Sequence, residues 1–183
     1  MPALALISPG AGGSENGYRY LAEGFEADGW RAVVMGHKES GAAALRSDIR
    51  DTHGIKNGLR ELVDDPKAYD ARLMDISGAL QWAEQSCKAP YVALIGHSMG
   101  ARTVMIEAGA KNKIGVKGRD RFKAYVAMSP DGPDSVFPEN AWKGIHKAML
   151  ILTGTRDKSM GTGEYKCARF LTGTCLRDAS GWV

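Results

Sequence analysis

The stretch Tyr91-Val92-Ala93-Leu94-Ile95-Gly96-His97-Ser98-Met99-Gly100 decides the fold. Its first half is a continuous apolar run, which is typical of a central parallel strand buried on both faces. Its second half fits the pattern G-x-S-x-G, and residues 101–110 behind it are predicted to form a helix. A serine at such a strand-to-helix turn adopts a strained conformation that lifts its hydroxyl above the sheet. The pattern therefore predicts that Ser98 is a nucleophile.

The residues that flank Ser98 agree with this interpretation. Side chains at the positions of Gly96 and Gly100 would collide with neighbouring backbone, so small residues are needed there. The helix that follows directs the positive end of its dipole and the free N–H of Met99 at a developing oxyanion. Met99 is thus predicted to supply one donor of an oxyanion hole.

Outward from this stretch, apolar runs alternate with amphipathic ones along the chain. An alternation of strands and helices favours a parallel sheet with helices on both faces. We therefore predict an α/β protein, a three-layer α/β/α sandwich around a mostly parallel sheet. The expected strands are residues 3–8, 31–35, 91–95, 122–128 and 148–153.

Two further segments complete the expected organisation. Asp65-Pro66 opens the clearest helix, with Asp as N-cap and Pro at the first helical position, and its inward stripe is Leu73, Ile76, Leu80 and Ala83. Residues 38–64 are polar and broken by glycines, which predicts a surface excursion with two short helices. No repeat or linker is found, so residues 1–183 are interpreted as a single domain.

Composition restricts the classes of function. The chain has 183 residues, 44% of them hydrophobic and 25% charged, and a net charge of +3 with scattered basic residues. These values give no support for nucleic-acid binding, and no apolar run approaches the ~20 residues of a membrane span. The three cysteines are odd in number and too few for a disulfide scaffold. We expect a reduced, cytoplasmic protein with neither nucleic acid nor membrane as partner.

A glycine-rich loop follows the first expected strand, with the sequence Pro9-Gly10-Ala11-Gly12-Gly13-Ser14. Acyl transfer needs a second N–H donor to the oxyanion, and glycines let a substrate approach the backbone closely. Ala11 is the predicted donor, with Gly12 as the next choice and as a substrate-binding residue. A dinucleotide loop of the form G-x-G-x-x-G would need glycine at position 15, which is Glu15.

Acidic residues follow the last two expected strands. Asp157 comes just past the strand 148–153, where a carboxylate can orient a histidine toward the serine, and the order Ser…Asp fits this arrangement. Asp131 follows the strand 122–128 and is the second choice for the acid. Its loop lies at the strand ends where substrates bind in open α/β sheets, so Asp131 is also predicted to be a substrate-binding residue.

Three passages together resemble the α/β-hydrolase superfamily, in particular bacterial dienelactone-hydrolase-like serine esterases. They are residues 7–13, 95–100 and 152–157, in the order found in the family. The resemblance implies Ser98 as nucleophile, Asp157 as acid, and Met99 with Ala11 as the oxyanion hole. It also implies hydrolysis of a small-molecule ester or related acyl bond through an acyl-enzyme, with neither metal nor organic cofactor.

The family's triad histidine has no counterpart after Asp157. The four histidines are His37, His53, His97 and His146, and His37 is the first to consider as a replacement base. The tail 158–183 is atypical of the family, so we expect a chain truncated before the catalytic histidine, with the last strand and helix missing. Such a chain would self-associate through an unpaired sheet edge. The alternative function is therefore a catalytically impaired or silent α/β-hydrolase-like domain.

Overall fold

The structure is a computed structural model that describes residues 2–154 and residue 157. The atypical tail predicted for residues 158–183 lies outside these described residues. In the part of the chain that is described, no helix is long and apolar enough to cross a membrane.

The described part of the chain forms one sheet of five strands, with the order β2-β1-β3-β4-β5. All neighbouring strands in it are parallel, which confirms the predicted parallel sheet. The apolar run before Ser98 forms the central strand, also as predicted. The strands are β1 (Leu4–Ser8), β2 (Arg31–Val34), β3 (Val92–His97), β4 (Ala124–Met128) and β5 (Met149–Leu152).

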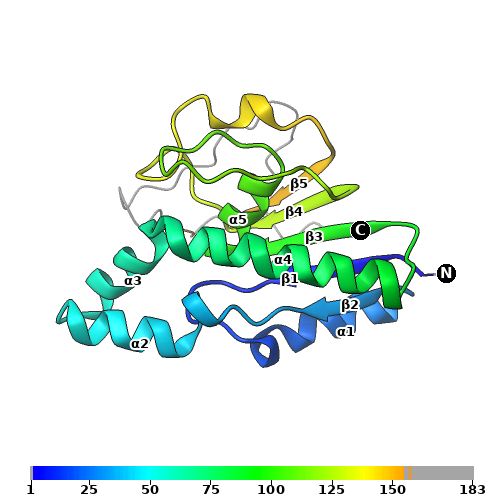
Figure 1. Cartoon of the computed structure of the whole chain (residues 1–183), viewed down its shortest axis with the longest axis horizontal. Helices are drawn as coiled ribbons and strands as arrows, with labels where there is room; N and C mark the ends of the chain where they lie inside the picture. Colours follow the sequence, from blue (N-terminus) through cyan, green and yellow to red (C-terminus); the bar gives the residue numbers. More distant parts are fainter. Residues whose placement is uncertain (1, 155–156, 158–183) are drawn as a thin grey trace.

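Helices cover both faces of the sheet, as Figure 1 shows. Helix α1 (Arg19–Ala27) packs Leu21 and Phe25 against Ile7 and Ile95 on one face. Because successive side chains of a strand point to opposite faces, the residues next to these in β1 and β3 face the other side. There Leu6 and Leu94 pack with α4 (Pro66–Ser86) and α5 (Met99–Glu107). This arrangement is the predicted three-layer sandwich.

The long helix α4 begins as the sequence predicts. Asp65 is its N-cap, and Asp65 Oδ1 accepts a hydrogen bond from the Lys67 N–H over 2.9 Å, while Pro66 occupies the first helical position. The predicted inward stripe is buried against the sheet. Its members are Leu73, Ile76, Leu80 and Ala83.

Residues 38–64 contain the two predicted short helices, preceded by a 3-10 turn at Lys38–Ser40. They are α2 (Ala42–Asp51), which buries no residue, and α3 (Ile55–Asp64). Two more 3-10 segments occur at Glu15–Tyr18, before α1, and at Ala141–Gly144, before β5. The helices α2 and α3 lead from β2 into α4 (Figure 1).

Candidate active site

Ser98 lies on a strained turn between β3 and α5. Its backbone angles are φ 53° and ψ −118°, a conformation that residues other than glycine rarely adopt. The turn brings α5 directly against the strands. A Cβ added at Gly96 would collide with the Gly100 carbonyl, and one added at Gly100 would collide with the carbonyl of Ser8. The glycines of G-x-S-x-G are therefore required by backbone contact, as predicted.

The backbone of Ser98 is fixed while its hydroxyl is free. The Ser98 N–H donates to the Met128 carbonyl over 2.9 Å, and the Ser98 carbonyl accepts from the Arg102 N–H over 3.1 Å. Its half-buried side chain has no hydrogen-bond partner within residues 2–154 or at residue 157. The turn thus presents an unengaged hydroxyl at the carboxyl end of the central strand.

Two backbone N–H groups beside this turn have no hydrogen-bond partner in the part of the chain that the structure describes. In the glycine-rich loop, the N–H of Gly10 donates to Tyr18 Oη (3.0 Å), that of Gly12 to the Ser40 carbonyl (2.8 Å) and that of Gly13 to the Gly10 carbonyl (3.1 Å). The Ala11 N–H has no partner among the described residues, nor does that of Met99 at the start of α5. Of the two predicted loop donors, only Ala11 is available, because the N–H of Gly12 is already engaged.

The predicted acid, Asp157, is held by short hydrogen bonds at the ends of β4 and β5. Its Oδ2 accepts from Ser129 Oγ over 2.7 Å and from the Gly154 N–H over 2.8 Å. The bond from Ser129 is the main cause that lowers the pKa of Asp157. Asp157 also acts on His97, where its charge raises the pKa against the larger lowering by burial. The carboxylate is therefore ionised at neutral pH and lies near the strand that carries Ser98.

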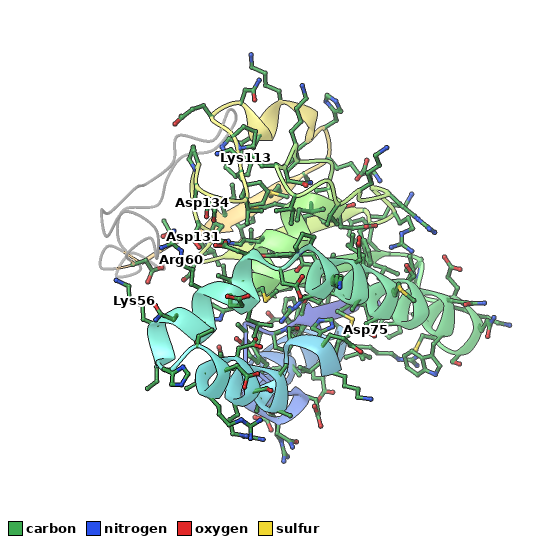
Figure 2. All side chains as sticks on the ribbon, turned by 60° about the vertical axis from the view of Figure 1, so that its left-hand side comes forward. Lys56, Arg60, Asp75, Lys113, Asp131 and Asp134 are labelled. Carbon is green, nitrogen blue, oxygen red and sulfur yellow. The ribbon has the colours of Figure 1, made fainter. Side chains whose placement is uncertain are left out.

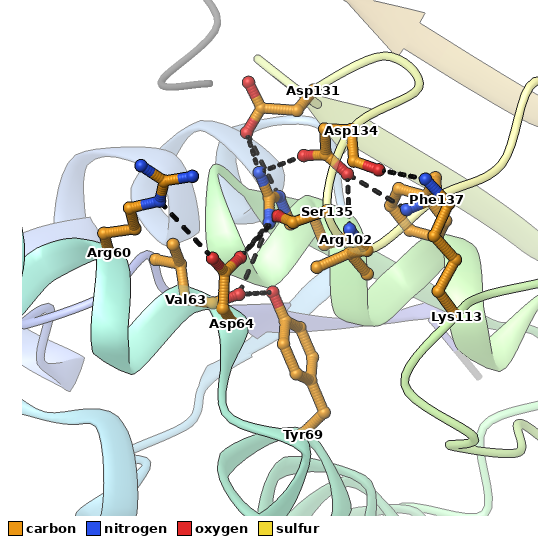
Figure 3. A network of polar contacts seen from close by, with 11 residues as sticks. Arg60, Val63, Asp64, Tyr69, Arg102, Lys113, Asp131, Asp134, Ser135 and Phe137 are labelled. Carbon is orange, nitrogen blue, oxygen red and sulfur yellow. Dashed lines mark hydrogen bonds and ion pairs between the residues drawn. The ribbon is translucent and has the colours of Figure 1, made fainter.

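Asp131, the second choice for the acid, is engaged by an arginine. Arg102 Nη2 lies 2.5 Å from Asp131 Oδ2 and 2.5 Å from Asp134 Oδ2, and Arg102 Nε donates to Asp131 Oδ2 over 3.1 Å. Figure 3 shows these contacts, which also include the Val63 carbonyl and Asp64. Burial lowers the pKa of Arg102, but Tyr69, Asp131 and Asp134 together raise it above its ordinary value. The charge of Asp131 is thus balanced from within the fold.

None of the four histidines forms a hydrogen bond with Ser98 Oγ. His37, the first histidine to consider as a replacement base, has both ring nitrogens engaged, since Nε2 lies 2.9 Å from Ser8 Oγ and Nδ1 lies 2.8 Å from Asp75 Oδ2. His97 Nδ1 lies 2.7 Å from Tyr18 Oη. Within the described residues, His37 is thus bonded to Ser8 and Asp75 and not to Ser98.

A buried polar cluster next to the glycine-rich loop was not predicted from the sequence. It consists of Ser8, His37, Arg72 and Asp75, and the first three are almost fully buried. One signal was present: Arg72 lies directly before Leu73 and four residues before Ile76, so it shares the inward face of α4. Arginines are almost never fully buried unless they are paired, so that position pointed to a polar partner.

Comparisons with known proteins find likeness in structure alone. No protein-family model matches the sequence, and no curated protein matches it significantly. A solved structure from work on LipS and LipT, two metagenome-derived lipolytic enzymes, covers 84% of this chain and 72% of its own at 17% identity, with a TM-score of 0.51. A protein from Xanthomonas campestris pv. campestris, described as a hydrolase of the α/β superfamily, has 16% identity and a TM-score of 0.47 over 82% of this chain and 70% of its own. The structure of esterase PE8 has 15% identity and a TM-score of 0.47, and the match covers 85% of this chain and 73% of the esterase chain.

At sequence identities this low, structural similarity supports a shared fold only. That inference rests on the structure with the TM-score of 0.51. The parallel sheet, the helices on both of its faces and the strained serine after the central strand agree with it. The predicted resemblance is thereby confirmed for the architecture. The chain has a three-layer α/β/α fold like that of this lipolytic-enzyme structure.

Proposed function

We propose that the chain is a serine hydrolase that cleaves a small-molecule ester or related acyl bond through an acyl-enzyme on Ser98. The observation that carries the proposal is the strained turn at Ser98, where the Ser98 hydroxyl and the N–H groups of Met99 and Ala11 have no partner among the described residues. Ser98 Oγ attacks the acyl carbon, the two N–H groups stabilise the oxyanion, and the alcohol leaves. Water then hydrolyses the acyl-enzyme and restores the serine.

The proton of the Ser98 hydroxyl needs an acceptor. Without one, the chain would be a catalytically silent domain, which is the second candidate function. Loss of a triad member lowers the rate by several orders of magnitude. Because none of the four histidines bonds to Ser98 Oγ, a silent domain with an intact serine turn is the alternative. In a serine hydrolase with the turn and donors in place, added imidazole would supply the missing base. In a silent domain, imidazole would change nothing.

Labelling with a fluorophosphonate separates the two functions, because this reagent forms a covalent bond with an activated serine Oγ. We expect the folded protein to be labelled at Ser98, and labelling to accelerate when imidazole is added. Ser98→Ala should abolish the signal, whereas Ser47→Ala, which alters a half-buried serine of α2, should not. Labelling that survives in Ser98→Ala contradicts the proposal. A folded protein that stays unlabelled with and without imidazole identifies the silent domain.

A further inference from the structure

Arg72 binds the backbone just before the free Ala11 N–H. We call residues 9–13 the oxyanion loop. The Nη1 of Arg72 donates to the Pro9 carbonyl over 2.7 Å, and its Nη2 donates to the Gly10 carbonyl over 3.3 Å. Its Nε donates to Ser40 Oγ over 2.7 Å, and the Ser40 carbonyl in turn accepts from the N–H of Gly12. One guanidinium thus holds the backbone on both sides of Ala11.

The charge of Arg72 has no bonded carboxylate among the described residues. Its side chain is buried, and the hydrogen bonds that it makes within the described residues go to hydroxyl and carbonyl oxygens. Burial lowers the pKa of Arg72 to about 10, so the guanidinium stays protonated at neutral pH. A buried charge without an ion pair is expensive unless its donors are well satisfied. Movement of the loop carbonyls away from Arg72 would leave the charge poorly compensated, so Arg72 resists that movement.

A chain of hydrogen bonds fixes the residue that precedes the loop. Because a carboxylate only accepts hydrogen bonds, the proton on His37 Nδ1 is donated to Asp75, and His37 Nε2 accepts from the Ser8 hydroxyl. Ser8 Oγ in turn accepts from Arg72 Nη1 over 3.3 Å. Although the order is serine, histidine and aspartate, Ser8 is 0% exposed and no substrate reaches it. The chain serves to lock Ser8 and Arg72 together.

The opposite face of the loop is held by Tyr18. Its Oη accepts the Gly10 N–H over 3.0 Å, so its own proton is free to bond His97 Nδ1 over 2.7 Å. His97 directly precedes Ser98. A Cβ added at Gly10 would lie 3.3 Å from Tyr18 Oη and 3.4 Å from Ser98 Cβ, which shows how closely the loop approaches the serine. Tyr18 therefore links the loop to the turn that carries Ser98 and Met99.

We propose that Arg72 and Tyr18 are positioning residues that clamp the oxyanion loop from the two faces of the sheet. Arg72 binds the carbonyls of Pro9 and Gly10, and Tyr18 binds the N–H of Gly10. Together they leave the Ala11 N–H unbonded and fix it relative to Met99. This inference rests on the proposed function, since the Ala11 N–H matters for catalysis only if Ser98 reacts.

Two measurements on Arg72→Met and Tyr18→Phe test the clamp. The first is the second-order rate constant of fluorophosphonate labelling at Ser98 in the presence of imidazole. We expect it to fall about 10- to 100-fold in either variant, the usual effect of misplacing a group by about 1 Å. The second is amide hydrogen exchange at Gly12 and Gly13, which does not depend on reactivity. We expect exchange to accelerate in Arg72→Met, because both N–H groups bond within the clamped backbone.

Arg121→Met is the matched control. Arg121 is also bonded to α4, through Ser77, and to the buried Glu107, yet it does not touch the oxyanion loop. Its loss should lower the free energy of unfolding without changing the labelling rate of folded protein. If Arg72→Met does not fold, Arg72→Lys replaces it: a lysine has one nitrogen and cannot reach Ser40 and both loop carbonyls, so we expect slower labelling there too.

The outcomes separate the clamp from the proposed function. Labelling at the wild-type rate in folded Arg72 and Tyr18 variants, or an equal loss in Arg121→Met, overturns the clamp. If the wild-type protein is never labelled, the proposed function fails, and exchange alone decides the clamp. Faster exchange at Gly12 and Gly13 in the Arg72 variant then supports it, and unchanged exchange overturns it.

Discussion

Ser129 Oγ donates a hydrogen bond to Asp157 Oδ2 over 2.7 Å, and this bond joins the end of β4 to the loop after β5. Ser129 itself has a positive φ of 49°, and its N–H donates to the Leu152 carbonyl over 2.6 Å. The residue is therefore held between the two strands. Its hydroxyl fixes the carboxylate that the sequence predicts to be the acid of the site.

Ser129→Ala should raise the pKa of Asp157. The bond from Ser129 stabilises the charged carboxylate and is the largest cause of its lowered pKa, so its removal favours the protonated form. The N–H of Gly154 still donates to Oδ2, and the pKa should therefore recover only part of the shift. Titration of the Asp157 carboxyl carbon by NMR measures this. Ser135→Ala, which removes a serine bonded to Asp64, is the control and should leave Asp157 unchanged.

The buried His37 should make the protein less stable in mild acid. Burial, reinforced by the charge of Arg72, lowers the pKa of His37 from 6.5 to about 4 in the folded state. Between those values the unfolded state binds the proton and the folded state does not, so stability falls as the pH drops from 6.5 to 4. The shift corresponds to a loss of about 3 kcal/mol in the free energy of unfolding, with no further loss from this group below pH 4.

Denaturant unfolding between pH 7 and pH 4 measures that loss. In His37→Gln this contribution should be absent, so its stability should fall less with pH than that of the wild type. His146→Gln, which changes an exposed histidine, should keep the wild-type dependence. If the free energy of unfolding falls equally with pH in the wild type and in His37→Gln, the loss of stability does not come from His37.

Local patterns predicted the fold and the position of Ser98, because both depend on neighbours in sequence. The apolar run of β3, the glycines on either side of the serine and the Asp65-Pro66 start of α4 are each contained in a few residues. The hydrogen-bond partners of His37 could not be predicted in this way. Its partners are Ser8, 29 residues away, and Asp75, 38 residues away. The parallel pairing of β1 with β2 brings Ser8 to His37, and the packing of α4 brings Asp75 there.

The same limit applies to the availability of the loop donors. Ala11 was the first choice for the donor and the adjacent Gly12 the second, but the sequence could not show that the Ser40 carbonyl accepts the N–H of Gly12. Asp131 is a second case. Its place after β4 suggested contact with substrate, whereas Arg102, one helical turn beyond Ser98, binds its carboxylate. Such pairings depend on tertiary packing, for which a single sequence holds no local signal.

Removing Arg102 should destabilise the protein strongly. Figure 2 shows Asp131 and Asp134 lying together, far from Asp75, and Arg102 is their shared cation. The side chain of Asp134 is only 4% exposed, so Arg102→Met leaves a buried carboxylate without its partner. We expect the free energy of unfolding to fall by about 3–5 kcal/mol. Urea denaturation at neutral pH measures it.

Arg60→Met is the matched control for Arg102. Arg60 belongs to the same group of charges, but its side chain is 66% exposed and its Nε lies 3.8 Å from Asp64 Oδ2. An exposed pair of this kind contributes at most about 1 kcal/mol. Equal losses in the two variants would show that the burial of the charges does not govern the stability of this group.

Two glycine-to-alanine changes should have opposite effects on stability. In Gly100→Ala the new methyl group would collide with the Ser8 carbonyl, so the start of α5 must move away from β1 and take Ser98 and Met99 with it. We expect lower stability and loss of fluorophosphonate labelling. In Gly78→Ala, within α4, the methyl group meets nothing within 4 Å. That variant should be more stable by about 0.5–1 kcal/mol, because alanine restricts the unfolded chain and favours the helix. Thermal unfolding of both variants, with labelling measured below the unfolding transition, tests these expectations. A Gly100→Ala protein as stable and as reactive as the wild type would contradict the close packing at the serine turn.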